Sequence, residues 1–153
     1  MNYSFSKAVE LVTNYDKIIE QYKLFKPELK SYIERTGSDK VIKILDSDNL
    51  VLTILGFEYA IRIMPCISNQ NIYGRVIFAE YFRKDDKLGD IVGELFINTR
   101  GAVFFSVEEV ANGWEEHEVS NLSPVEMSAS SKAISTHILL PIINKVFDII
   151  DFD

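Results

Sequence analysis

The N-terminal part of the chain carries apolar side chains at steps of three and four residues. One stripe of a 3.6-residue helix contains Phe5, Ala8, Val12, Tyr15, Ile19 and Tyr22. Ser4 or Ser6 can cap the start of such a helix, and Gly37 suits its end. Pro27 lacks the N–H that a helix interior needs, and it fits the first turn of a new helix better. The pattern therefore predicts a kinked helix or a helix pair over residues 6–36.

Beyond residue 40 the pattern changes to short runs rich in β-branched and aromatic residues, separated by clusters of turn formers. About six strands are expected, at 41–45, 50–55, 59–64, 73–82, 91–97 and 102–107. Residues 66–71 and 83–90 are expected to be loops between strands. Asn98–Gly101 is expected to be a hairpin turn, because Asn and Gly tolerate positive φ. Short strands at this spacing predict an antiparallel meander.

The C-terminal part begins with a helix-start signal, Ser123-Pro124-Val125-Glu126. Serine caps the helix, proline occupies its first position and glutamate can complete a capping box. A long helix is expected over about residues 124–150. Its second half, from Ile138 onward, is apolar on most sides and is expected to be buried, with a kink at Pro141. The fold class is therefore α+β, with the sheet flanked by N-terminal and C-terminal helices.

Packing rules favour both helices on one face of this sheet. The other face would then be partly solvated or covered by a partner. The chain has 153 residues, of which 47% are hydrophobic and 25% charged, so residues 1–153 are expected to form a single domain. A single cysteine, Cys66, gives no internal disulfide, and neither a signal peptide nor a membrane span is visible. These features predict a cytoplasmic protein.

The formal net charge is −7. Phosphate contacts need clustered Lys and Arg, so this balance disfavours nucleic acid as a partner. It is compatible with a basic protein partner, and it also serves solubility.

Signatures of catalysis are missing from the sequence. The chain has no phosphate-binding glycine motif, and its two histidines, His117 and His137, are twenty residues apart and distant from Cys66. Both histidines are interpreted as structural or surface residues, and Cys66 as a buried inert thiol. We expect no metal, no cofactor and no enzyme activity.

One segment, residues 108–118, is marked for function. It contains the single tryptophan, Trp114, and five glutamates without any Lys or Arg. The predicted partner-binding residues are Glu108, Glu109, Trp114, Glu115, Glu116 and Glu118. Tryptophan offers a large rigid contact area and one donor, so it suits an anchor against a basic surface. The alternative is that Trp114 belongs to the core and the acids simply face water.

The leading hypothesis is a small protein-binding domain, and in its narrower form an immunity or antitoxin-type inhibitor of a basic, nuclease-like toxin. The first alternative is a secretion-type or substrate-binding chaperone, which would expose a large apolar patch. The second is an enzyme whose carboxylates and tyrosines assemble across the sheet without a sequence motif. The sequence does not identify the partner or the oligomeric state.

Overall fold

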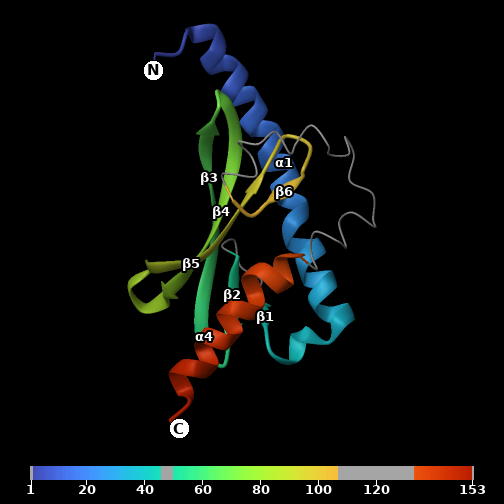
Figure 1. Ribbon diagram of the computed structural model, residues 1–153, viewed down its shortest axis with the longest axis vertical. Coiled ribbons are helices and arrows are strands. Elements are labelled where there is room, and N and C mark those ends of the chain that lie inside the picture. The colour runs from blue at the N-terminus through green and yellow to red at the C-terminus, as the bar shows by residue number, and fades with distance from the viewer. Residues whose placement is uncertain (1, 46–49, 107–132, 153) are drawn as a thin grey trace.

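The computed structural model describes residues 2–45, 50–106 and 133–152, and it has the predicted α+β architecture (Figure 1). A long N-terminal helix is followed by a six-stranded antiparallel sheet whose strands are ordered as in the chain, and then by a C-terminal helix. This confirms the predicted meander. The strands are β1 Lys43–Leu45, β2 Val51–Ile54, β3 Phe57–Ser68, β4 Asn71–Phe82, β5 Lys87–Ile97 and β6 Val103–Phe104.

Helix α1 (Phe5–Thr36) is one uninterrupted helix, so the predicted helix pair is wrong. The Ser4 hydroxyl caps it by accepting a hydrogen bond from the Lys7 N–H at 3.0 Å, and Gly37 ends it in the left-handed conformation. Pro27 lies inside the helix at an exposed position, where water can solvate the carbonyl of Lys23 that proline leaves without a donor. Packing of the neighbouring turns keeps the helix continuous.

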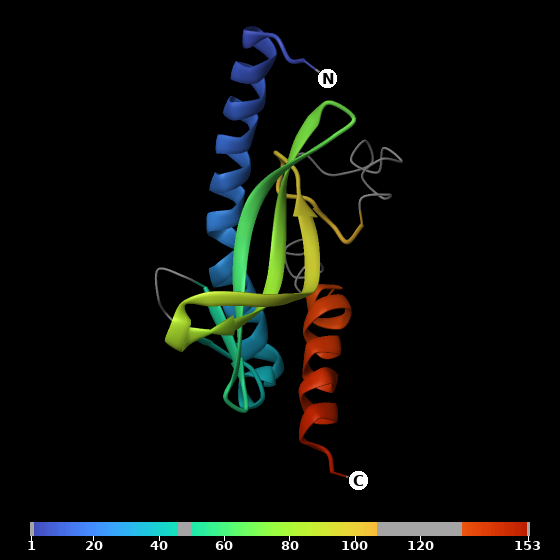
Figure 2. The ribbon, with the colours of Figure 1, turned by 90° about the vertical axis from the view of Figure 1, so that its left-hand side faces the viewer.

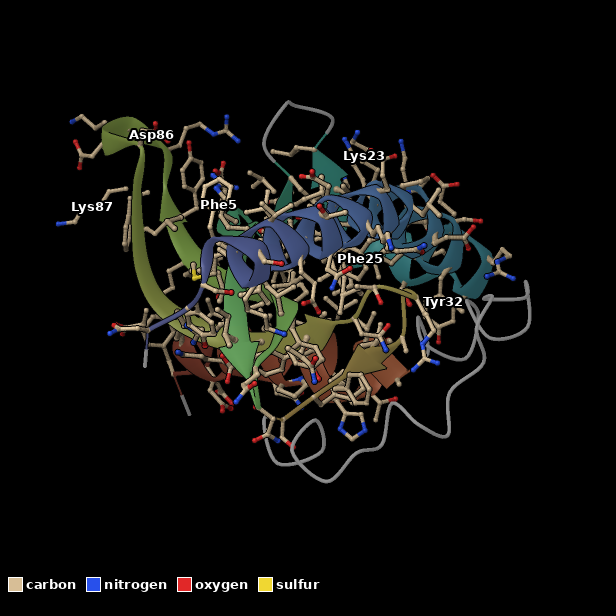
Figure 3. All side chains as sticks on the ribbon, turned by 90° about the horizontal axis from the view of Figure 1, so that it is seen from above. Phe5, Lys23, Phe25, Tyr32, Asp86 and Lys87 are labelled. Atoms are coloured by element: carbon tan, nitrogen blue, oxygen red, sulfur yellow. The ribbon has the colours of Figure 1, made fainter. Side chains whose placement is uncertain are left out.

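The buried stripe of α1 differs from the predicted one. It consists of Leu11, Ile18, Phe25, Leu29 and Ile33. Phe5, in the first turn of α1 beyond the end of the sheet, is 87% exposed (Figure 1). Val12 is 63% exposed, whereas its neighbour Leu11 is buried, so Val12 lies on another side of the helix. Viewed from above, Phe25 lies on the side of α1 that faces the rest of the molecule, and Lys23 points away (Figure 3). Tyr15 and Tyr22 of the predicted stripe are half-buried and pack against the core.

The long hairpin of β3 and β4 replaces the loop predicted at residues 66–71. The strands stay paired to Ser68↔Asn71, and Asn69 and Gln70 form the turn with φ of 51° and 65°. Two consecutive positive φ angles match the twist of a two-residue hairpin. Pro65 is tolerated within β3 because pairing with β2 ends at Val51↔Ala60, which leaves the later part of β3 as an edge on that side.

The connection between β4 and β5 is shorter than the predicted loop at 83–90. A single 3-10 turn, η2 (Arg83–Asp85), leads to Asp86 at φ 45°, and β5 begins at once. The pairing of β4 with β5 shifts register at Phe78/Ala79 and again at Ala79/Tyr81. Such bulges increase the local twist and bend the strand. In Figure 2 the first part of β5 accordingly lies at a steep angle to its second part.

The turn predicted at Asn98–Gly101 is confirmed. The Gly101 N–H donates to the Asn98 carbonyl at 3.1 Å, and Gly101 has φ of 85°. The buried Asn98 side chain also accepts from the N–H groups of Arg100 and Ala102, both at 2.9 Å. Asparagine therefore satisfies three backbone donors of a two-strand connection, which explains its burial.

Both helices pack on the same face of the sheet, as predicted. Gly74 on β4 meets Ile18 of α1, and Gly93 on β5 meets Ile138. Gly93 pairs with Phe78, which lies four residues from Gly74 and therefore on the same face. The two helices and this face enclose the main core, with the N- and C-termini at opposite ends of the molecule (Figures 1 and 2).

A π turn precedes the proline of the C-terminal helix. The turn η4 (Ser135–Leu139) closes with the Leu140 N–H on the Ser135 carbonyl, and α4 (Leu140–Ile150) follows. Pro141 sits in the first turn of α4, where no N–H is needed. The start predicted at 123–126 lies outside the described residues.

The predicted burial of the C-terminal helix is wrong in extent. One stripe, Ile138, Leu139, Ile142 and Val146, is buried. Leu140 and Phe147 lie on the other side of the helix and are about half exposed. A helix on the sheet surface has neighbours along one stripe, so apolar residues around its whole circumference do not all find a partner.

Candidate functional site

The acidic segment 108–118, including Trp114 and His117, lies outside the described residues. The charge of this segment can still be compared with that of the described residues. The described residues contain fifteen Lys and Arg and fourteen Asp and Glu. The remaining residues hold nine acids and one base, so they account for the negative charge of the protein. The described residues are together close to neutral, and the acidity is concentrated in the remaining short stretches of the chain.

The sheet face opposite the helices carries a network of paired charges. Arg75 binds Glu94 through Nε and Nη2, both 2.7 Å from the same carboxylate oxygen. Arg83 places its Nε 3.0 and 3.1 Å from the two oxygens of Glu58. Hydrogen bonding to Glu58 raises the pKa of the Arg83 guanidinium, which keeps it charged. The acids and bases here neutralise each other.

Tyr81 lies at the centre of this network. Its hydroxyl donates to Asp86 at 2.8 Å, and the guanidinium carbons of Arg62 and Arg83 lie 5.9 and 5.8 Å from its ring centroid. The hydrogen bond to Asp86 raises the pKa of Tyr81. Such exposed cation–π and ion-pair contacts order side chains and add little stability. Further along this face a small aromatic cluster of Tyr73, Phe96 and Phe104 is buried.

A cleft of about 290 Å³ opens where the start of β3 and the end of β4 meet α4. Its apolar walls include Phe57, Phe82 and Ile149. Its ionisable lining residues are Glu58, Tyr59, Glu80, Tyr81 and Lys145. This volume is close to the lower end of the roughly 300–1,000 Å³ typical of small-molecule sites, and apolar walls with a few polar groups are usual there.

The cleft contains one ion pair, with Lys145 Nζ 3.8 Å from Glu80 Oε1. Glu80 is the more buried partner, with its side chain 32% exposed against 49% for Lys145. Burial, and secondly the negative charge of Glu80, raise the pKa of Tyr59. Tyr59 therefore remains protonated at neutral pH, where it can donate a hydrogen bond and cannot act as a base.

The sequence reasoning missed this cleft. Tyr59 and Glu80 are direct cross-strand partners, whereas Lys145 comes from a helix far along the chain. Side chains alternate between the two faces of a strand, so a known register of β3 and β4 would have placed Tyr59 and Glu80 on the same face. Nothing local points to Lys145.

Cys66 and His137 do not line this cleft. Cys66, expected in a loop, is in β3, half-buried beside the aromatic cluster. His137, interpreted from sequence as a structural or surface residue, is exposed, with its ring centroid 4.8 Å from that of Phe105. Within the described ranges, no three His, Cys, Asp or Glu side chains gather as metal ligands would.

No family model, curated protein or solved structure matches this chain. In the part of the chain that the structure describes, none of the helices combines the length and apolarity needed to cross a membrane.

Proposed function

We propose that this protein is a non-catalytic protein-binding domain that neutralises a basic partner, with a nuclease-like toxin as the specific case. The concentration of charge supports the proposal. The described framework holds nearly equal numbers of acids and bases, whereas segment 108–118 holds five glutamates and no Lys or Arg. General solubility needs only dispersed charge, so an uneven distribution of this kind favours recognition of a basic surface.

In this proposal the glutamates and Trp114 have different tasks. Glu108, Glu109, Glu115, Glu116 and Glu118 attract the basic partner and speed the encounter, an effect that salt weakens. Trp114 supplies the contact that excludes water and slows dissociation. The cytoplasm is the proposed compartment of this encounter.

A chaperone is the second candidate, and the exposed apolar side chains of the helices favour it. Phe5, Val9 and Val12 lie within two turns on one side of α1, and all are more than half exposed. Leu140 and Phe147 add a second such surface on α4. A chaperone should suppress aggregation of several unrelated clients, whereas an inhibitor should bind one protein tightly.

Fluorescence quenching of Trp114 tests the recognition site before any partner is identified. As an anchor, the indole should be open to solvent in the free protein. We expect acrylamide to quench it nearly as well as it quenches N-acetyltryptophanamide. Acrylamide is uncharged, so the glutamates do not repel it. The chain has one tryptophan, so the signal needs no deconvolution. A protected indole would place Trp114 in the core and remove it from the proposed site.

A further inference from the structure

We propose that the cleft between Phe57, Phe82 and Ile149 binds a small organic cation, an alkylammonium or alkylguanidinium group like the end of a lysine or arginine side chain. The inference goes beyond the proposed function, because it uses no residue of segment 108–118. It rests on the charge, the walls and the shape of the cleft.

The charge of the cleft favours a cation. Glu80 is the more buried member of the ion pair with Lys145, and the 3.8 Å distance of that pair is long beside the 2.7 Å contacts between Arg75 and Glu94. Lys145 is half exposed on a flexible stem, so it can turn out to water when another cation enters. The carboxylate of Glu58 is held by Arg83 and does not compete.

The walls suit the carbon stem of such a cation. Phe57, Tyr59 and Phe82 bring three aromatic rings to the cleft, and Ile149 adds an aliphatic surface. Aromatic faces attract cations, and apolar walls bury the methylene groups that carry a lysine or arginine head group. Burial and, secondly, the Glu80 carboxylate raise the pKa of Tyr59, and the same carboxylate would repel a ligand that carries a carboxylate or phosphate.

The shape of the cleft depends on Gly89 at the start of β5. A Cβ atom at this position would lie 2.7 Å from Phe82 Cε2 and 3.3 Å from Glu80 Oε2. The missing side chain therefore lets the ring of Phe82 and the carboxylate of Glu80 lie against the β5 backbone. Gly89 therefore allows the positions of both Phe82, in the wall of the cleft, and Glu80, its anionic group.

Titration of the full chain with n-butylammonium, followed by ¹H–¹⁵N NMR, tests the inference. We expect saturable shifts at Phe57, Tyr59 and Glu80, with no such response to n-butanol or butyrate. Glu80→Gln should weaken binding by at least about tenfold, the effect of losing a charged partner. Lys145→Met should strengthen it several-fold by removing the competing cation. Glu94→Gln removes a comparably exposed carboxylate elsewhere on the sheet and should leave binding unchanged.

Equal binding of n-butanol, unchanged affinity in Glu80→Gln, or weaker binding in Lys145→Met would each overturn the cation site. The source of the cation is distinguished by a second titration with the capped peptide acetyl-Gly-Lys-Gly-amide. Binding of both compounds supports a protein side chain as the natural ligand, and binding of n-butylammonium alone supports a free amine. Neither result tests segment 108–118, so the cation site and the proposed inhibitor function are tested independently.

Discussion

Replacing Phe78 with alanine is expected to lower the free energy of unfolding by about 3–5 kcal/mol. Phe78 is 0% exposed and lies in the middle of β4, paired with Ile61 on one side and Gly93 on the other. Its ring belongs to the core that α1, the sheet and the C-terminal helix share, so its removal leaves a cavity inside that core. Urea unfolding followed by far-ultraviolet circular dichroism measures the loss.

Phe82→Ala is the matched control for this substitution. It removes the same side chain from the same strand, four residues further on, where the ring is 50% exposed. We expect it to cost less than about 1.5 kcal/mol, because roughly half of the ring is already in water. Equal losses in the two variants would contradict the position of the core.

The second large effect is expected at Gly74, where α1 packs closely against the sheet. A Cβ atom there would lie 2.7 Å from Ile18 Cγ2 and 2.8 Å from Ile63 Cδ1, and both contacts are within the core. Gly74→Val should therefore destabilise the protein by about 1–3 kcal/mol through overpacking. Urea unfolding again gives the value.

A double-mutant cycle with Ile18→Ala shows whether α1 causes this cost. Shortening Ile18 opens space for the valine, so Gly74→Val should cost less in the Ile18→Ala background, by about 1 kcal/mol. Strictly additive losses would mean that Gly74 does not contact α1, and the helix would have to sit elsewhere on the sheet.

Local signals predicted the ends of α1 and the β5–β6 turn. The cap at Ser4, the left-handed Gly37 and the turn at Asn98–Gly101 depend on backbone groups a few residues away, and those are visible in sequence. The buried side of α1 was not predictable in this way. Apolar residues with helical spacing occur on more than one side of α1, and the approach of Ile18 to Gly74 in the core decides which side is buried.

The hairpin at Asn69 and the cleft were missed for related reasons. Ser, Asn and Pro around residue 69 resemble a loop, but pairing across the hairpin holds both strands extended to Ser68↔Asn71. The cleft needs the register that opposes Tyr59 and Glu80, and it needs the C-terminal helix to bring Lys145 to them. Register and helix placement are tertiary properties, so no short window of sequence contains them.

Capture of the partner from a lysate of the source organism tests the proposed function most directly. The baits are the wild-type chain and a variant with glutamine at the five glutamates of segment 108–118. A control bait carries the same change in net charge on exposed acids elsewhere. These are Glu10, Asp16, Glu20, Glu34 and Asp39.

At low and moderate salt, mass spectrometry should find one stoichiometric basic protein on the wild-type and control baits and its loss from the segment variant. Identical proteins on all three baits, or none on the wild-type bait, would contradict the account.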